Sequence, residues 1–181
     1  MKILKTKFKD LLIFRKTTHN DDRGYFRELF IQNKIKKKFI FDYLSLSKKN
    51  VIRGIHIQLQ KPQAKLITVF SGEIFDVVID CRKKSKTFGK HFSLYMSSKK
   101  NTSLYIPEGF AHGFCSLSNN TILHYKCSSY RDKKSEIGII WNDKNLKIDW
   151  PTKQPIVSQK DRKNYKFLDF LEYKKFKKVR W

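Results

Sequence analysis

One stretch of the sequence decides the fold: Asn50–Val69 reads N-V-I-R-G-I-H-I-Q-L-Q-K-P-Q-A-K-L-I-T-V. It contains two runs of mainly β-branched and aliphatic residues, joined by a short polar link at Gln60–Gln63. These runs predict two neighbouring strands, one through Ile52–Leu59 and the next through Leu66–Phe70. Held on rigid strands, two cations and an imidazole would form the floor of a binding or catalytic site. A strand histidine more often serves only packing, so other residues must decide between these readings. The side chains in question are Arg53, His56 and Lys65.

Apolar runs of the same kind recur along most of the chain, about every 8–12 residues, with Gly, Pro and Asn turns between them. They predict further strands at Leu11–Arg15, Tyr25–Phe30, Phe39–Ser47, Ile74–Cys81, His91–Met96, Ser103–Ile106, Phe114–Leu117, Ile122–Cys127 and Ile137–Trp141. Such an alternation of short strands and turns is typical of a β-sandwich or barrel.

The pattern changes after Trp150-Pro151. Ser158–Asp161 is a suitable helix start, because a serine hydroxyl caps the free N–H groups of a first turn. Apolar residues within Asn164–Lys175 predict one or two short helices. A length of 181 residues fits a single domain. We therefore expect one all-β domain over residues 1–181. Its core should cover about residues 20–150 and its helical segment about residues 158–175.

Composition excludes several classes of protein. Hydrophobic residues make up 40% of the chain and aromatic residues 14%, which is typical of a globular protein. No apolar run approaches the roughly 18 residues of a membrane span, and the N-terminus lacks the apolar core of a signal peptide. We expect no membrane partner. The three cysteines lie in strand-like runs, so we expect free buried thiols in a reducing cytoplasm: Cys81, Cys115 and Cys127.

The formal net charge of +24 raises the question of a nucleic-acid partner. Only eight of the 40 basic residues are arginines, the lysines are spread over the whole chain, and no nucleic-acid motif is present. Because nucleic-acid readers favour Arg for bidentate contacts, a lysine-rich background composition explains the charge better. We expect no nucleic-acid partner. The positive field would still attract an anionic small molecule such as a sugar nucleotide.

A second stretch supplies another histidine: Tyr105–Phe114 reads Y-I-P-E-G-F-A-H-G-F. Its Pro-x-Gly-x-x-His pattern, ending in His112, resembles the second half of the cupin signature. In metal cupins the first half supplies a His-x-His pair and a Glu, whereas here His56 is followed by Gln58 and then by Lys65. Two imidazoles beside a lysine do not make a stable divalent-metal site. We expect a cupin-type jelly-roll barrel that uses no metal and no other cofactor.

The reactive side chains suit one kind of chemistry. Histidine abstracts protons near neutral pH, and this role fits His56. Lysine stabilises an oxyanion without a metal, which fits Lys65. Tyr125 can donate a proton, and a buried Asp can hold a histidine base in the required tautomer. Together these groups fit removal of a proton next to a ketone, with the enolate held by a cation.

Several stretches together resemble one family, the dTDP-4-dehydrorhamnose 3,5-epimerases, which are metal-free cupins. They run in the family's order over roughly residues 20–165. They read D-D-R-G-Y-F-R-E, V-I-R-G-I-H-I-Q, Q-A-K-L-I-T-V-F-S-G-E-I-F-D-V-V-I-D, S-K-T-F-G, I-P-E-G-F-A-H-G-F, L-H-Y-K-C, W-N-D-K-N-L-K-I-D-W-P and S-Q-K-D. The resemblance implies an epimerase that inverts C3 and C5 of a nucleotide-diphosphate 4-keto-6-deoxyhexose.

The resemblance also implies roles for individual residues. By motif, His56 is the base and Asp161 its partner in a His-Asp pair. Tyr125 is the acid on the opposite face of the sugar, and Lys65 stabilises the enolate. Positions that contact the substrate in the family are occupied by Arg53, His112, Glu136, Lys160, Arg23 and Glu28. In the family, the N-terminal strand of one subunit lies against the neighbouring subunit. Arg23 and Glu28 are therefore expected to serve the site of the other subunit in a homodimer.

The chain departs from the family on the strand before R-G-x-H. The family usually has Gln-x-Asn there, and here Phe41 and Tyr43 fall at those positions. This difference leaves open a different nucleotide, inversion of a single carbon, or a sugar-nucleotide-binding protein without catalysis. Strict alternation would also place Arg53 and His56 on opposite faces of their strand, unless the chain bends at Gly54.

Overall fold

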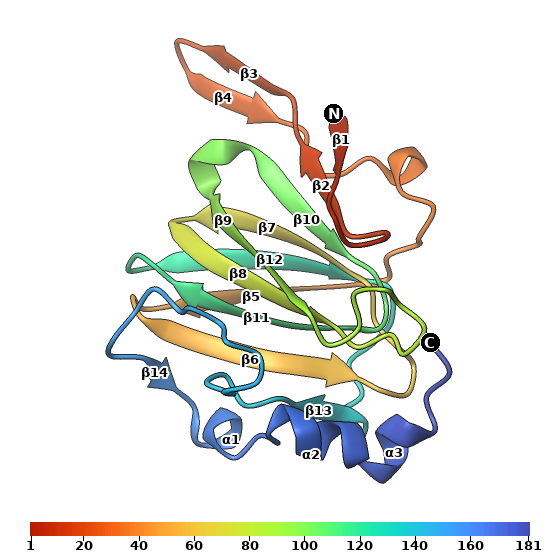
Figure 1. Ribbon diagram of the computed structural model, residues 1–181. Coiled ribbons are helices and arrows are strands. Elements are labelled where there is room, and N and C mark those ends of the chain that lie inside the picture. The colour runs from red at the N-terminus through yellow and green to blue at the C-terminus, as the bar shows by residue number, and fades with distance from the viewer.

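Two six-stranded sheets face each other in the computed structural model, which describes residues 1–181 (Figure 1). The first sheet has the strand order β1 (Lys2–Lys5), β2 (Leu12–Arg15), β10 (Thr102–Ile106), β7 (Lys65–Ser71), β12 (Thr121–Cys127) and β5 (Phe41–Ser47). The second has the order β13 (Glu136–Gly138), β6 (Val51–Gln58), β11 (Phe110–Ser116), β8 (Glu73–Asp80) and β9 (His91–Ser97), and β14 (Ile156–Val157) pairs with β6. The predicted all-β architecture is confirmed.

The space between the two sheets is filled by an apolar cluster that both sheets supply. Leu104 and Leu123 enter it from the first sheet, and Val78 and Phe114 enter it from the second. Along β12, every second residue is buried while those between are only partly covered. This period of two gives the strand one inward face, which was the signal used in the sequence analysis.

The second sheet is buried on both of its faces. Its outer face packs against three short helices, which lie below β6 in Figure 1: α1 (Gln159–Arg162), α2 (Phe167–Glu172) and α3 (Lys174–Lys177). On β8, Val77 and Ile79 join the cluster under these helices, whereas Ile74 and Val78 join the cluster between the sheets. Burial on both faces explains why β8 is a continuous apolar run. None of the helices is both long and apolar enough to cross a membrane.

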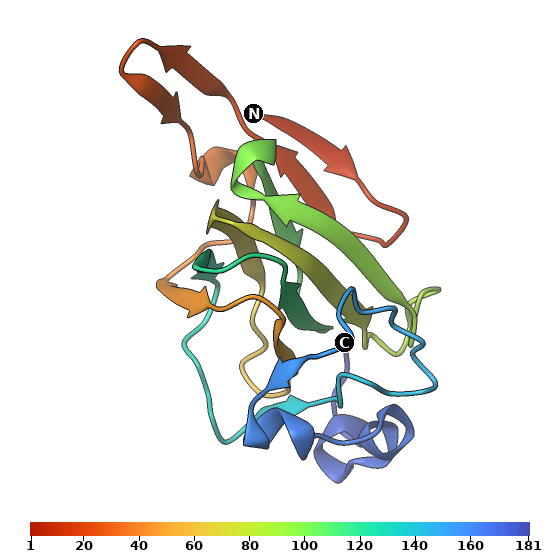
Figure 2. The same cartoon turned by 90° about the vertical axis from the view of Figure 1, so that its left-hand side faces the viewer.

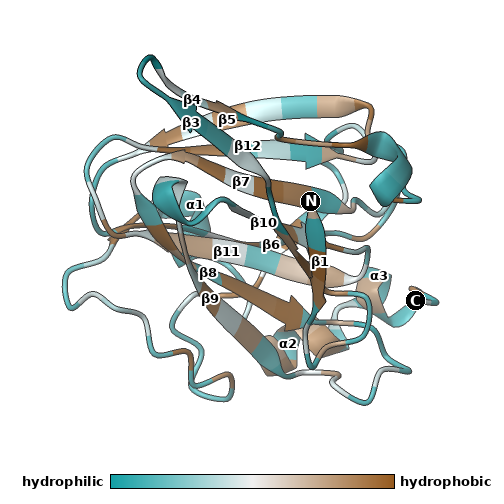
Figure 3. Cartoon of the chain, turned by 90° about the horizontal axis from the view of Figure 1, so that it is seen from above, coloured by the Kyte–Doolittle hydropathy of each residue, from teal (hydrophilic) through white to brown (hydrophobic).

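A hairpin of β3 (Thr18–Asp21) and β4 (Gly24–Arg27) projects from the body, on the side away from the helices (Figures 1 and 2). The strand β3 is hydrophilic, in contrast to the hydrophobic β8 (Figure 3). The hairpin pairs with no other strand, and the side chains of Tyr25 and Phe26 are 62% and 74% exposed. Two large aromatic side chains are therefore presented mostly to solvent on this projecting hairpin.

Several element boundaries differ from the predictions. The strand predicted at Phe114–Leu117 begins at Phe110, because pairing with β8 continues through His112. The strand predicted at Tyr25–Phe30 is β4, and it ends at Arg27. The strand predicted at 137–141 is the three-residue β13, and β1, β3 and β14 had no predicted counterpart. The first sheet also takes in β1 and β2, which precede the expected core at about residue 20.

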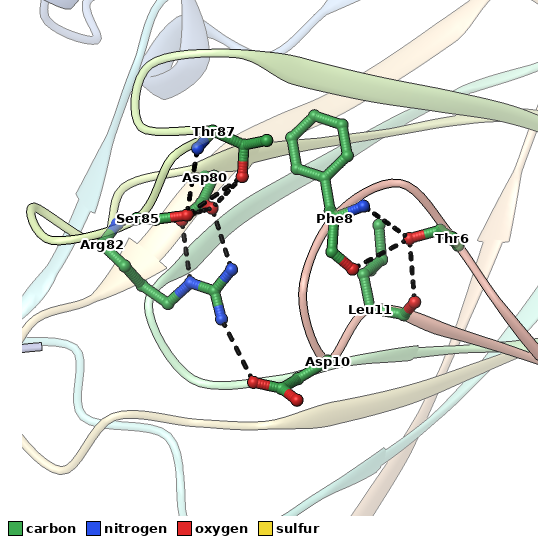
Figure 4. A network of polar contacts seen from close by, with 8 residues as sticks. All are labelled: Thr6, Phe8, Asp10, Leu11, Asp80, Arg82, Ser85 and Thr87. Atoms are coloured by element: carbon green, nitrogen blue, oxygen red, sulfur yellow. Dashed lines mark hydrogen bonds and ion pairs between the residues drawn. The ribbon is translucent and has the colours of Figure 1, made fainter.

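A polar cluster organises the loop that follows β8 (Figure 4). Asp80 accepts hydrogen bonds from Arg82 Nε at 2.9 Å and Nη2 at 2.8 Å, and from the hydroxyls of Ser85 and Thr87, both at 2.6 Å. Arg82 Nη1 also lies 3.7 Å from Asp10 Oδ2, which links the loop to the N-terminal turn. Within the S-K-T-F-G segment, the two hydroxyl residues therefore serve to satisfy a buried carboxylate.

Candidate active site

One cavity of about 700 Å³ is bounded by strands of both sheets and by α1. All four residues predicted to be catalytic line it, together with four of those predicted to contact the substrate: His56, Lys65, Tyr125, Asp161, Arg53, His112, Glu136 and Lys160. The volume is in the range of small-ligand sites. The barrel therefore brings residues from distant parts of the sequence into one site.

His56 and Asp161 form a hydrogen-bonded pair. His56 Nε2 lies 2.6 Å from Asp161 Oδ1, and the Gly54 N–H donates to Oδ2 at 3.3 Å. Asp161 is placed by the start of α1, where the Ser158 hydroxyl accepts its N–H at 3.1 Å. Burial opposes ionisation of Asp161, but the hydrogen bonds from His56 and Gly54 hold its pKa below the usual range. An ionised carboxylate only accepts, so His56 Nε2 carries a proton and Nδ1 is left to take one.

Arg53 and His56 share the cavity because β6 bulges between them. His112 on β11 pairs with His56 and Phe114 pairs with Arg53, so three steps along β6 match two steps along β11. The extra residue cancels the alternation that would have put the two side chains on opposite faces. Gly54 has a φ of +116°, and a Cβ there would lie 2.7 Å from the His112 carbonyl oxygen. The bend that the sequence left open at Gly54 is thus present, and only glycine fits there.

A second imidazole–carboxylate pair lies beside the first. His112 Nε2 is 2.8 Å from Asp76 Oδ2, and both side chains are buried. His112 pairs across the strands with His56, so the two rings belong to neighbouring positions of one sheet. Asp76 holds the His112 ring in place, a contact that the sequence analysis did not predict because it depends on the register of β8 against β11.

Tyr125 reaches the cavity from β12, and its side chain is almost fully buried. Its hydroxyl has Ser45 Oγ as a neighbour at 3.4 Å. The ring of Tyr43 stacks on it with a centroid distance of 4.3 Å. Burial raises the pKa of the Tyr125 phenol far above its ordinary value, so the group keeps its proton at neutral pH and can donate it.

Lys65 stands at the start of β7 on the cavity wall. Burial lowers the pKa of its ammonium group, while the negative charges of Glu136 and Asp76 act in the opposite direction. A cation that is partly stripped of water interacts strongly with an oxyanion brought next to it. Lys65 therefore has the environment expected of a residue that stabilises an enolate.

Glu136 joins two cations at the cavity. Its carboxylate accepts two hydrogen bonds from Arg131, at 2.8 and 2.9 Å, and one from Lys160 at 2.5 Å. Burial opposes ionisation of Glu136, but these bonds and the nearby His56 lower its pKa to about 2. Arg131 also lines the cavity and was missed in the sequence analysis. Its only sequence signal was a position shortly after a strand and five residues before Glu136.

Arg23 and Glu28 lie apart from the cavity of their own chain. Arg23 is in the exposed turn of the β3–β4 hairpin, where its Nη2 donates to Asp21 Oδ2 at 2.7 Å. Glu28 directly follows β4. One chain alone therefore does not bring these two predicted residues to the site.

The arrangement is matched by a known family. Residues 5–169 fit the family model described as dTDP-4-dehydrorhamnose 3,5-epimerase. The chain belongs to this family. A curated member from Shigella flexneri is 43% identical over 176 residues, which cover 93% of this chain and 97% of that protein. A member from Methanothermobacter thermautotrophicus is 40% identical over 169 residues, which cover 89% of this chain and 91% of that protein. Membership confirms the predicted activity: the chain is an isomerase that epimerises a dTDP-linked 4-keto-6-deoxy sugar at C3 and C5.

Solved structures share the same barrel. The dTDP-4-dehydrorhamnose 3,5-epimerase of Elizabethkingia anophelis has a TM-score of 0.88 and 38% identity, covering 93% of this chain and 97% of that one. The dTDP-6-deoxy-D-glucose-3,5-epimerase of Legionella pneumophila, in complex with dTDP-4-keto-L-rhamnose, has the same TM-score and identity, covering 91% of both. A 3′-monoepimerase from Streptomyces bikiniensis in complex with dTDP-quinovose has a TM-score of 0.85 and 27% identity, covering 92% of this chain and 88% of that one. The predicted jelly-roll barrel is confirmed, and its relatives bind dTDP-sugars.

Phe41 and Tyr43, at the positions where this chain departs from the family, also line the cavity. They point inward because alternate residues of β5 face the barrel interior. Phe41 lies 5.6 Å from Tyr43 and 5.9 Å from Tyr130 between ring centroids. Tyr43 also stacks on Tyr125, so four aromatic rings lie in one connected row. We call Phe41, Tyr43, Tyr125 and Tyr130 the aromatic wall.

Proposed function

We propose that four residues of this cavity carry out the epimerisation: His56, Asp161, Lys65 and Tyr125. The observation that supports this most strongly is the 2.6 Å contact between His56 and Asp161 in the cavity that Lys65 and Tyr125 also line. A histidine base oriented by a carboxylate, an oxyanion-stabilising cation and a protonated phenol are the groups that inversion next to a ketone requires.

The reaction then proceeds through an enolate. His56 Nδ1 takes the proton next to the ketone, and the carboxylate of Asp161 stabilises the imidazolium that forms. The ammonium of Lys65 stabilises the negative charge that develops on the ketone oxygen. Tyr125 gives its hydroxyl proton to the same carbon from the opposite face, so one C–H bond breaks and another forms with inverted geometry. Imidazolium and tyrosinate return to their starting states by proton exchange with solvent, and the cycle repeats at the second carbon.

We assign substrate binding to Arg53, His112, Glu136 and Lys160. Arg53 is anchored by two hydrogen bonds, from Nε to Ser47 Oγ at 3.0 Å and from Nη2 to the Leu46 carbonyl at 2.9 Å. These bonds orient the guanidinium while leaving Nη1 for a ligand. Because a dTDP-sugar carries a diphosphate, the concentration of cations at the cavity favours its binding.

Deuterium incorporation tests the assignment. The purified protein is incubated with dTDP-4-keto-6-deoxyglucose in deuterated water, and the sugar is analysed by mass spectrometry and NMR. We expect two deuterium atoms per converted sugar, at C3 and C5. One deuterium would indicate epimerisation at a single carbon, and none would rule out this substrate. A folded His56→Asn variant is the control, and it should introduce no deuterium at either carbon.

We propose that the protein is a homodimer in which the hairpin of one subunit brings Arg23 and Glu28 to the other subunit's site. The outer face of the first sheet exposes Leu44 and Leu46 by 60% and 61%, beside Phe70 at 39%, and apolar surface of this kind suits a second copy. Light scattering after gel filtration should give the dimer mass, and a Leu46→Glu variant should be shifted toward monomer. A wild-type monomer at micromolar concentration would contradict the proposal.

We also propose a cytoplasmic location. The three cysteines are free and buried, a state suited to a reducing compartment. Cell fractionation with an antibody to the protein tests this, and recovery outside the cytosolic fraction would contradict it.

A further inference from the structure

The phenol of Tyr125 is held by ring contacts more than by hydrogen bonds. Its distance of 3.4 Å to Ser45 Oγ is long, because O–H···O hydrogen bonds are usually about 2.7–2.8 Å. The ring of Tyr43 lies against one face, with centroids 4.3 Å apart and planes only 13° from parallel. The His112 ring lies edge-on, with a centroid distance of 6.2 Å and an angle of 69°. The flat contact with Tyr43 is therefore the closest aromatic contact of the Tyr125 ring.

Strand register creates this stack. Tyr43 and Tyr125 are directly opposite each other in the antiparallel pairing of β5 with β12. Both residues point toward the barrel interior, so their rings come to lie side by side. Phe41, two positions before Tyr43 on β5, lies 5.6 Å from the Tyr43 ring. Tyr43 thus has Phe41 on one side and Tyr125 on the other, and its flat contact is with Tyr125 alone.

We propose that Tyr43 is a positioning residue, whose stacked ring fixes the direction from which the Tyr125 hydroxyl protonates the substrate carbon. The inference rests on the proposed role of Tyr125 as the acid. A proton donor must be held close to one face of the enolate, because small displacements of a reacting group slow its step strongly. The hydroxyl of Tyr125 has only a long contact to Ser45, so the packing around its ring, in which Tyr43 supplies the flat contact, must provide that constraint.

A loosened Tyr125 affects only one half of the reaction. His56 still removes the proton, because it is held independently by Asp161. The enolate then regains a proton from His56 on the original face, and in deuterated water this return labels the sugar without inverting it. Loss of the stack therefore lowers the ratio of inversion to exchange, a quantity that a general loss of folding or of substrate binding does not change.

The experiment measures this ratio for four variants with dTDP-4-keto-6-deoxyglucose in deuterated water. Tyr43→Leu and Tyr43→Met both remove the flat ring, and they replace it with a branched and an unbranched side chain of similar volume. Tyr43→Phe keeps the ring without its hydroxyl. Phe41→Leu is the matched control, because it removes an aromatic residue from the same wall but not the ring that stacks on Tyr125.

We expect the ratio to fall at least about tenfold in Tyr43→Leu and Tyr43→Met, and to stay within about twofold of wild type in Tyr43→Phe and Phe41→Leu. Circular dichroism verifies that each variant is folded. A wild-type ratio in a folded Tyr43→Leu or Tyr43→Met protein overturns the inference. An equal fall of exchange and inversion overturns it as well, because Tyr43 would then serve only folding or binding.

A reference variant separates this inference from the proposed function. Tyr125→Phe should itself lower the ratio, and adding Tyr43→Leu to it should cause no further fall, because the two residues act on one step. If Tyr125→Phe lowers the ratio but Tyr43→Leu does not, only the positioning role fails. If Tyr125→Phe leaves the ratio unchanged, the acid role of Tyr125 and the role of Tyr43 fail together.

Discussion

Two buried carboxylates, Asp161 and Asp80, are satisfied by different kinds of partner in this protein. Asp80 accepts hydrogen bonds from a guanidinium and two hydroxyls, at distances of 2.6 to 2.9 Å. Asp161 accepts one from the His56 imidazole at 2.6 Å and one from a backbone N–H at 3.3 Å. Both groups have a lowered pKa, because these hydrogen bonds outweigh burial. They differ in their partners.

The partners decide what each carboxylate can do. Guanidinium and hydroxyl groups keep their protons throughout the physiological pH range, so the Asp80 cluster can only hold the loop in place (Figure 4). An imidazole is able to gain and lose a proton near neutral pH, so the charge on Asp161 acts on the group that we propose as the base. We infer that a carboxylate can assist proton transfer only when its partner is itself able to gain and lose a proton.

His56→Asn gives the largest expected effect. Without the imidazole no base remains, so exchange at both carbons should fall by roughly 10²–10⁴-fold or more. The amide is able to hydrogen bond to Asp161, so the fold should persist. Deuterium exchange measured beside circular dichroism checks this. A folded variant that exchanges at the wild-type rate would remove His56 as the base.

Asp161→Asn should reduce turnover by roughly 10²–10⁴-fold, because a neutral amide neither stabilises the imidazolium nor enforces its tautomer. Its free energy of unfolding should change less than that of Asp80→Asn. Steady-state kinetics and denaturant unfolding test the two parts of this prediction. Turnover within threefold of wild type (a threshold of about 0.7 kcal/mol) would show that His56 works without its carboxylate.

Asp80→Asn should show the reverse pattern. Removing the charge leaves the partly buried Arg82 without its carboxylate, at an expected cost of about 2–4 kcal/mol in the free energy of unfolding. Activity per folded molecule should remain close to wild type, because none of the cluster lines the cavity. Urea unfolding followed by fluorescence measures the free energy of unfolding, and a kinetic assay measures the activity per folded molecule. A large loss of activity in the folded variant would break the distinction between the two carboxylates.

The smallest expected effect concerns pH. Glu136 has its pKa lowered to about 2, so its ion pairs add stability above its unfolded value of 4.5, and this contribution is lost as pH falls toward 2. Because Arg131 and Lys160 are half exposed, the contribution should be on the order of 1–2 kcal/mol. Comparing unfolding of wild type and Glu136→Gln at pH 7 and pH 3 checks it: the difference should shrink at the lower pH.

The sequence predicted what depends on local pattern and on motif. Period-two alternation located the long strands, and the family resemblance placed His56, Lys65, Tyr125 and Asp161, which all line one cavity. The two-residue strand β14 is too short to produce a pattern.

Contacts that depend on strand register were not predictable. The bulge at Gly54 and the Asp76–His112 pair both arise from how β11 lies against its neighbours. The stack of Tyr43 on Tyr125 likewise depends on residues 82 positions apart being paired across two strands. A local pattern fixes which face a side chain takes, but not which side chain it meets.

The two-sided burial of β8 has a consequence for how the protein melts. Its alternate residues belong to the apolar cluster between the sheets and to the one beneath the helices, so a single strand is shared by both. Loss of packing in one cluster therefore weakens a strand on which the other cluster also depends. We infer that residues 1–181 form one cooperative unit, and that calorimetry on the pure protein should give a single transition with equal calorimetric and van't Hoff enthalpies.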